Sequence, residues 1–134
     1  MTHRHTLRVR YGECDMQGVV FNAHYLAYCD DALTAWMAAA LREAVPYFGS
    51  PSPTFDYMVK KAELTWTAPF RFGDVVDLDC SVVRWGTTSF DVRVRGTVDG
   101  DERFFADFVQ VSVTPGTNTP AAVPDHVKAA LSGG

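Results

Sequence analysis

A carboxylate lies seven residues ahead of an expected helix start, in the segment Asp15-Met-Gln-Gly-Val-Val-Phe-Asn22. The start of a helix presents backbone N–H groups that lack partners within the helix, at the positive end of its dipole. A carboxylate facing such groups across a small gap can attack a carbonyl carbon, or activate water against it, while the N–H groups stabilise the carbonyl oxygen. Asp15 and the helix start therefore form a candidate centre for acyl transfer without serine, cysteine or metal.

Asp15 also has a purely structural interpretation, because an aspartate ahead of a helix often hydrogen-bonds its own loop. Gly18 and the aromatic residues around the loop favour the catalytic role. Cys14 is a neighbouring candidate nucleophile, but no cysteine–histidine pair stands out, so a small packing residue is the favoured interpretation. Glu13 either raises the pKa of Asp15 by like-charge repulsion or is a surface carboxylate.

Hydrophobic periodicity places this segment between a strand and a helix. Residues 5–14 alternate Leu7, Val9 and Tyr11 with arginines, which is the pattern of a half-buried strand. From about residue 23 to residue 42, apolar residues recur at the spacing of an amphipathic helix. The residues that define its apolar face are Tyr25, Tyr28, Ala32, Trp36, Ala39 and Ala40.

Four further strands are expected after a loop over residues 46–53, which is rich in proline. They cover approximately residues 57–68, 75–85, 88–98 and 103–114, and Asp99-Gly100 is a hairpin signal between the last two. A short helix is expected over residues 124–131. One helix packed on one sheet makes a two-layer α+β domain. We expect a single domain over residues 1–134, with its core at about 5–114 and a C-terminal tail at 115–134.

Composition limits the class of protein. With 134 residues, 47% of them apolar, the chain can build a core, and a net charge of −4 without a basic tract argues against a nucleic-acid surface. No segment has the apolar length of a membrane span, and the N-terminus lacks the apolar core of a signal peptide. Cys14, Cys29 and Cys80 have no metal or redox spacing and are expected to be reduced. We therefore expect a cytoplasmic protein with no nucleic-acid or membrane partner.

The Asp15 loop and the order of elements together resemble the hotdog fold, and specifically the acyl-CoA thioesterases of the 4-hydroxybenzoyl-CoA thioesterase type. The strongest part is Arg10-Tyr-Gly-Glu-Cys-Asp-Met-Gln-Gly-Val-Val-Phe-Asn-Ala-His-Tyr-Leu-Ala-Tyr28. Support comes from Ala68-Pro69, Gly73-Asp74-Val75 and Gly86-Thr-Thr-Ser-Phe90, so the resemblance covers about residues 5–114. It implies one long helix wrapped by a five-stranded antiparallel sheet.

The resemblance also implies the site. Asp15 is the expected catalytic carboxylate, as nucleophile or general base, and the backbone N–H of Asn22 is expected to bind the thioester oxygen. The Asn22 side chain is also expected to cap the helix. Tyr11 and Gly18 are expected to shape the loop. Coenzyme A, as part of the substrate, is expected to contact Tyr57, Met58, Val59, Lys60, Gly86, Thr87 and Thr88, and no metal or separate cofactor is implied.

Two departures from the family pattern concern specificity. Some relatives that act on aliphatic acyl-CoA carry histidine where this chain has Asn22. The aromatic-acyl prototype carries a basic cluster around the hairpin that is Gly86-Thr-Thr88 here. The cations left for the nucleotide phosphates are Lys60, Lys61, Arg84 and Arg93.

Three classes of function follow: a hydrolase of acyl-CoA or acyl carrier protein thioesters, a hotdog protein that binds acyl groups without turnover, and a structural subunit. The combination of Asp15, Gly18 and the helix start favours the hydrolase, because a binding protein needs no carboxylate at the carbonyl. The active form is expected to be a homodimer or, more favoured, a homotetramer, because the sheet has edges and an outer face to cover. In such an assembly Asp15 is expected to share its site with another subunit.

Overall fold

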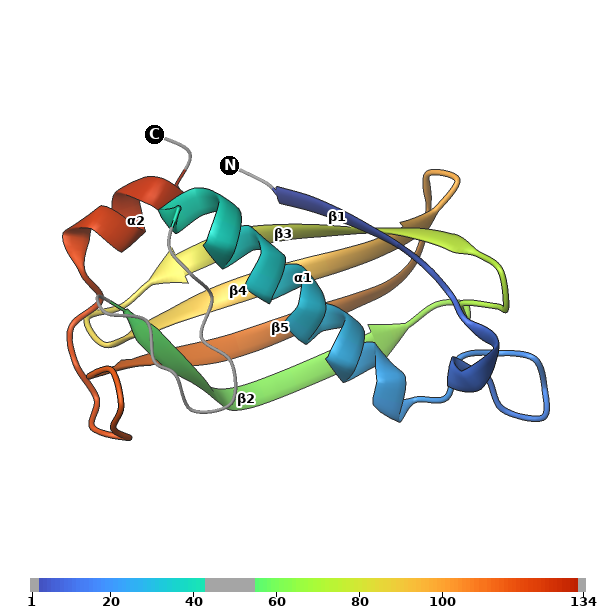
Figure 1. Ribbon diagram of the computed structural model, residues 1–134, viewed down its shortest axis with the longest axis horizontal. Helices are drawn as coiled ribbons and strands as arrows, with labels where there is room; N and C mark the ends of the chain where they lie inside the picture. Colours follow the sequence, from blue (N-terminus) through green and yellow to red (C-terminus); the bar gives the residue numbers. More distant parts are fainter. Residues whose placement is uncertain (1–2, 43–54, 133–134) are drawn as a thin grey trace.

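One antiparallel sheet and one long helix form the fold. The structure, a computed structural model, describes residues 3–42 and 55–132. The elements are β1 (His3–Arg8), a 3₁₀ turn (Tyr11–Glu13), α1 (Ala23–Leu41), β2 (Asp56–Trp66), β3 (Val75–Trp85), β4 (Ser89–Val98), β5 (Asp101–Val113) and α2 (Asp125–Leu131). The strands pair in the order β1-β3-β4-β5-β2, and α1 lies across one face of the sheet (Figure 1). The predicted hotdog-type α+β architecture is confirmed, whereas the predicted loop at 46–53 lies outside the described residues.

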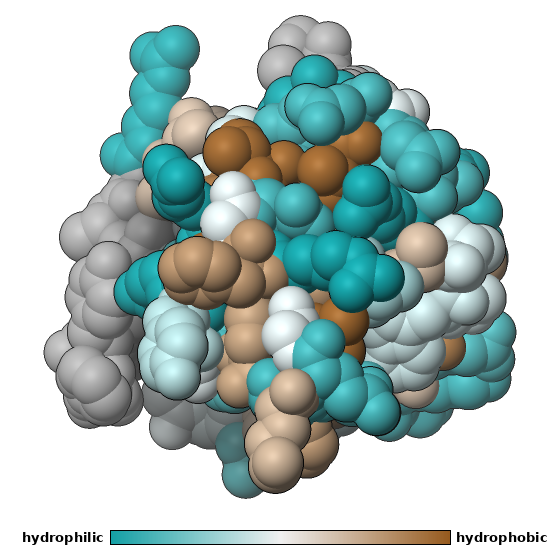
Figure 2. Space-filling model, turned by 90° about the vertical axis from the view of Figure 1, so that its right-hand side faces the viewer, coloured by the Kyte–Doolittle hydropathy of each residue, from teal (hydrophilic) through white to brown (hydrophobic). Residues whose placement is uncertain are grey.

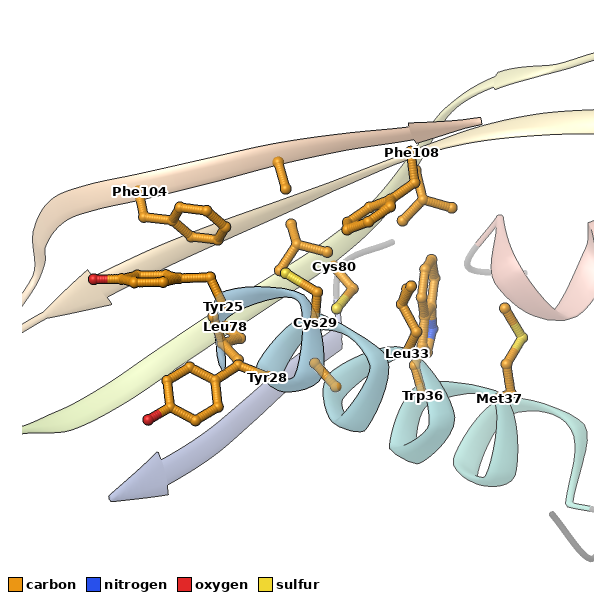
Figure 3. Close-up of a cluster of buried hydrophobic side chains, with 14 of the residues drawn as sticks. Tyr25, Tyr28, Cys29, Leu33, Trp36, Met37, Leu78, Cys80, Phe104 and Phe108 are labelled. Carbon is orange, nitrogen blue, oxygen red and sulfur yellow. The ribbon is translucent and has the colours of Figure 1, made fainter. Parts of the chain in front are cut away.

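The core lies between α1 and the sheet. Residues three or four apart on α1 form its buried stripe, and the sheet contributes alternate residues of β3, β4 and β5. Figure 3 shows Tyr25 and Leu33 of the helix pointing toward the sheet, where Phe104 and Phe108 lie. The hydrophobic effect therefore fixes the helix to the sheet along most of its length. None of the described helices has the length and apolar character needed to cross a membrane.

The first strand is shorter than its alternating pattern predicts. Strand β1 ends at Arg8, and the Val9 N–H then donates to the Asp74 carbonyl at 2.9 Å. The Glu13 carboxylate accepts a hydrogen bond from the Arg10 N–H at 2.8 Å, which closes the 3₁₀ turn. This local capping interaction replaces strand pairing, so Tyr11 is 83% exposed instead of facing the core.

The other strands agree with the predicted ranges to within two residues at each end, and the Asp99-Gly100 hairpin is confirmed. Both of its turn residues have positive φ, 51° and 80°, as a type I′ turn requires. Strand β5 is interior, between β4 and β2, and its outer face carries charge. Asp107 on that face accepts hydrogen bonds from the Arg93 guanidinium at 2.7 and 2.8 Å.

Gly96 in β4 lets the aromatic ring of Phe70 pack directly on the sheet. A Cβ atom at residue 96 would lie 2.5 Å from the Phe70 ring. We expect Gly96→Ala to lower the free energy of unfolding by about 1–3 kcal/mol, because the core must shift to accept the methyl group. Denaturant unfolding measures this effect. Gly12→Ala is the matched control, since its Cβ meets nothing within 4 Å, and equal stability of the two variants would contradict the prediction.

Candidate active site

Asp15 begins a tight turn that ends at Gly18. The Gly18 N–H donates to the Asp15 carbonyl at 3.0 Å, and the Asp15 N–H donates to the Val19 carbonyl at 2.9 Å. Gly18 has φ +76°, a conformation that glycine adopts without steric penalty. Asp15 Oδ1 accepts a hydrogen bond from the Gln17 N–H at 2.8 Å, whereas Oδ2 has no partner among the described residues. The exposed carboxylate is thus held by its own loop and keeps one oxygen free.

Backbone hydrogen bonds attach this turn to the rest of the fold. The Val20 N–H donates to the Phe70 carbonyl at 2.9 Å, and the Phe21 N–H donates to the Glu13 carbonyl at 3.0 Å. The Phe70 N–H in turn donates at 3.0 Å to the hydroxyl of Tyr25, which lies in the first turn of α1. The Asp15 turn is therefore fixed relative to the helix start, which is what a catalytic carboxylate requires.

The helix start presents backbone donors, as expected. The His24 N–H bonds the Phe21 carbonyl at 2.9 Å and the Tyr25 N–H bonds the Asn22 carbonyl at 3.3 Å. Within residues 3–42 and 55–132, no acceptor is found for the N–H of Asn22 or Ala23. The expected side-chain cap is wrong, because the Asn22 side chain makes no capping hydrogen bond and its backbone is already helical, with φ −50° and ψ −37°.

Substitutions at Asn22 and at Gly18 are expected to differ in their effects on stability and rate. Asn22→Ala should change stability by less than about 1 kcal/mol, because no side-chain cap is lost, and should alter the rate of thioester hydrolysis only modestly. Gly18→Val should be far more harmful, since a β-branched residue is strained at φ +76°. Thermal unfolding and kcat separate the two variants. Equal losses of kcat in two folded variants would indicate that the Asn22 side chain itself takes part in the chemistry.

Asp15 and Asn22 line two different pockets. Asp15 lines an open pocket of about 610 Å³ together with Tyr11, Gly18 and Phe72. Asn22 lines a second, of about 400 Å³, that includes Val19. The rings of Tyr11 and Phe72 meet edge to face at 6.0 Å and give the first pocket an apolar wall. Figure 2 shows this end of the molecule, where apolar patches lie between hydrophilic side chains. The sequence interpretation missed Phe72, although the aromatic residues that follow Pro69 were a usable signal.

Glu13 has a role that the sequence did not suggest, because its carboxylate contacts the helix. It accepts hydrogen bonds from the Tyr28 hydroxyl at 2.8 Å and from Arg10 Nη2 at 2.8 Å, and its side chain is only 12% exposed. Burial opposes ionisation, but the hydrogen bonds from Arg10 and Tyr28 outweigh it and lower the pKa of Glu13 below its ordinary value. Glu13 therefore links the segment before Asp15 to α1.

This link predicts a pH-dependent contribution to stability. Because the pKa of Glu13 is lowered in the folded state, its contribution is complete above the unfolded value of about 4.3 and is lost as pH falls through the folded value. Glu13→Gln should therefore lower the melting temperature at pH 7, and the difference from wild type should shrink below about pH 4. Calorimetry at both pH values measures it. A difference that grows in acid would contradict this role.

The residues expected to contact coenzyme A gather at the opposite end of the sheet from Asp15. The hairpin Gly86–Thr88 joins β3 to β4 beside α2, whereas the Asp15 turn lies at the other end of α1 (Figure 1). The Thr87 carbonyl accepts from the Val123 N–H at 2.9 Å, which attaches the hairpin to the C-terminal segment. The Tyr57 ring lies 6.0 Å from that of Phe90, close to this hairpin. A single chain therefore does not bring Asp15 and the hairpin together.

The residues of β2 that are expected to contact coenzyme A lie on both faces of the sheet. Tyr57 and Val59 pair with Ser112 and Gln110, and cross-strand partners share a face, here the helix side. Met58 pairs with Val111 on the outer face, and Lys60 is the extra residue of a bulge between Val59 and Lys61. The contact residues on this strand therefore do not all face one channel.

The candidate phosphate-binding cations differ in whether a carboxylate already pairs with them. Arg84 is paired with Asp91 at 2.9 Å, and Arg93 is paired with Asp107 at 2.7 Å. Lys60 and Lys61 are exposed and form no ion pair with any described residue. The two lysines are thus the cations of this set that are available to a phosphate.

The cysteines fit a packing role. None of them is in a disulfide, and Cys29 and Cys80 are buried. Burial raises the pKa of Cys14, and nearby carboxylates add to this effect, so its thiolate is disfavoured. Burial also raises the pKa of Cys80 to about 12. In the part of the chain that the structure describes, no three His, Cys, Asp or Glu side chains are grouped so as to hold a metal ion.

Comparison with known proteins gives the family. The family model described as the thioesterase-like superfamily matches residues 9–131. A thioesterase-superfamily structure from Jannaschia sp. CCS1 is 22% identical, with a TM-score of 0.88 over 97% of this chain and 90% of the other. A 1,4-dihydroxy-2-naphthoyl-CoA thioesterase from Synechocystis is 15% identical, with a TM-score of 0.78 over 98% and 96%.

A third similar structure is a thioesterase from Thermus thermophilus, described as complexed with coenzyme A and Zn. It is 21% identical, with a TM-score of 0.76 over 96% of this chain and 90% of the other. No curated protein matches the sequence. At these identities the structural matches establish the fold, and the family model covers nearly the whole sequence. The chain therefore belongs to the thioesterase-like superfamily and has its hotdog fold.

Proposed function

We propose that this protein hydrolyses the thioester of small acyl-CoA molecules, using the Asp15 carboxylate and the backbone N–H of Asn22. The observation that carries this proposal is a free carboxylate oxygen on a turn that hydrogen bonds connect, through Phe70, to Tyr25 in the first turn of α1, where the N–H groups of Asn22 and Ala23 lack acceptors among the described residues. Membership of the thioesterase-like superfamily supports it. So does the coenzyme A named with the similar Thermus thermophilus thioesterase.

The proposed reaction has two alternative first steps. Asp15 either attacks the thioester carbon, which gives an acyl–aspartate anhydride that water then hydrolyses, or it removes a proton from a water molecule that attacks the same carbon. In both, the carbon–sulfur bond breaks and the products are the free acid and the coenzyme A thiol. Gly18 lines the Asp15 pocket and the next residue, Val19, lines the Asn22 pocket, and we place the thioester carbonyl between Asp15 and the Asn22 N–H, beside these two residues.

A second copy of the chain completes the proposed site. Strand β2 is an edge of the sheet, 11 residues long, and both Met58 and Val59 on it are exposed. The other edge, β1, has only six residues. An exposed strand edge pairs readily with another chain, so we propose that β2 mediates a homodimer and that two dimers form the tetramer. We place the enzyme in the cytoplasm, where its three thiols stay reduced.

Release of the coenzyme A thiol tests the proposal directly. The purified protein is mixed with aromatic and short to medium aliphatic acyl-CoAs, and a colorimetric thiol reagent reports turnover. Hydrolysis that is abolished in Asp15→Asn supports the proposed mechanism. Binding of acyl-CoA without thiol release would instead identify a non-catalytic acyl-CoA or acyl carrier protein binding protein. Absence of both binding and release would leave a structural role.

A further inference from the structure

The segment 69–74, between β2 and β3, supports both parts of the proposed site. Its Phe72 N–H donates at 3.3 Å to the carbonyl of Gly18, in the turn of the proposed carboxylate. Its Phe70 N–H donates at 3.0 Å to the hydroxyl of Tyr25, in the first turn of α1. The position of this segment therefore affects the separation between the carboxylate and the backbone donors at the helix start.

One arginine of β5 holds this segment to the sheet. Arg103 Nη1 donates to the Pro69 carbonyl at 3.2 Å and to Asp74 Oδ2 at 3.2 Å, so it joins the two ends of the segment. The same Asp74 oxygen accepts a hydrogen bond from the Arg71 N–H at 2.8 Å, which closes the turn between them. The Arg103 and Asp74 side chains are only 23% and 22% exposed, so water and salt compete weakly with their pairing.

The backbone of Arg103 makes a separate attachment. Its carbonyl accepts hydrogen bonds from the Thr67 N–H at 2.9 Å and the Ala68 N–H at 3.1 Å, and these bonds do not depend on the side chain. Among the described residues, the other carboxylate near its guanidinium is that of the exposed Asp101, at 3.8 Å. A substitution of the Arg103 side chain should therefore act mainly on the segment 69–74.

We propose that Arg103 is a positioning residue that fixes the separation between Asp15 and the Asn22 N–H by holding the segment 69–74. Misplacement of reacting groups by about 1 Å can lower a rate on the order of 10²-fold. A partly exposed ion pair contributes little to stability, and a purely stabilising pair changes the fraction of folded protein without changing kcat of the folded molecules. This inference rests on the proposed thioesterase function.

The test separates kcat from KM in thiol release from the best acyl-CoA substrate. Arg103→Met removes the guanidinium, and kcat should fall about tenfold or more while KM changes less than about threefold, because the residues expected to contact coenzyme A lie at the other end of the sheet. Arg103→Lys should recover most of the rate. Both hydrogen bonds come from one nitrogen, which an ammonium group with its three donors can replace.

Arg95→Met is the matched control. It removes another ion pair of the sheet, Arg95–Glu102 at 2.7 Å between β4 and β5, whose side-chain hydrogen bond involves no residue of the segment 69–74. This variant should keep the wild-type kcat. Thermal unfolding shows which variants are folded at the assay temperature.

The outcomes separate this inference from the proposed function. The role of Arg103 is overturned if folded Arg103→Met keeps at least half of the wild-type kcat, if Arg95→Met loses as much, or if folded Arg103→Lys is no faster than Arg103→Met. If Arg103→Met does not fold, Asp74→Asn decides, because it keeps an oxygen for the Arg71 N–H but loses the charge that pairs with Arg103. An unchanged kcat in that variant overturns the role as well. All these results leave the thioesterase function intact, whereas absence of thiol release by the wild type contradicts the proposed function itself.

Discussion

Asp15→Asn should fold as the wild type does and lose thioester hydrolysis. The asparagine side chain keeps an oxygen in the place of Oδ1, so it can still accept the hydrogen bond from the Gln17 N–H that closes the turn. It lacks the negative charge needed for attack or for proton removal. If Asp15 is the nucleophile or general base, kcat should fall on the order of 10²–10⁴-fold or more.

Controls decide whether that loss comes from the carboxylate itself. Asp125→Asn, an exposed aspartate at the start of α2, makes the same change in charge far from the turn and should leave kcat unchanged. Circular dichroism and thermal unfolding show whether each variant is folded. If Asp15→Asn retained more than half of the wild-type rate on the best substrate, the carboxylate mechanism would be wrong.

Secondary structure was largely predictable because the buried residues of each helix or strand recur at the spacing typical of that element. The stripe on α1 and the alternation of β4 are direct consequences of one face packing on the other layer. The end of β1 was not predictable from alternation, because the Arg10–Glu13 interaction that stops the strand is a competing local hydrogen bond. The bulge at Lys60 was also hidden, since it depends on pairing with β5.

The candidate site was predictable only where it is local in sequence. Gly18 indicated a turn, and the turn with its positive φ is present beside Asp15. The contact between Glu13 and Tyr28 joins residues 15 positions apart through a side chain, and no spacing pattern reports it. The burial of Gln110, whose side-chain amide has no hydrogen-bond partner among the described residues, was not predictable either. Whether a glutamine on a strand is buried depends on the elements that pack against it.

Because the Asp15 turn and the Gly86–Thr88 hairpin are far apart, we expect two variants that are each inactive to restore activity when they are mixed. The two lie at opposite ends of one subunit, so a substrate that contacts both must reach them on different chains. We expect the Asp15→Asn variant and a Thr87→Trp, Thr88→Trp variant each to be inactive alone. The tryptophans act by blocking the hairpin, where Thr87 is exposed and Thr88 is half-buried. An interface that forms such shared sites should bury more than about 1,200 Å² in total.

Mixing the two inactive variants after reversible dissociation should restore activity. In a mixed dimer, one site combines the intact Asp15 of one subunit with the intact hairpin of the other, while the second site carries both defects. Random pairing of equal amounts makes half of the dimers mixed, so roughly a quarter of the wild-type activity should return. A chain that carries all three substitutions is the matched control, because mixing it with Asp15→Asn subunits leaves no complete site. A monomer by light scattering that hydrolyses acyl-CoA at the full rate would exclude the shared site, since one chain would then suffice.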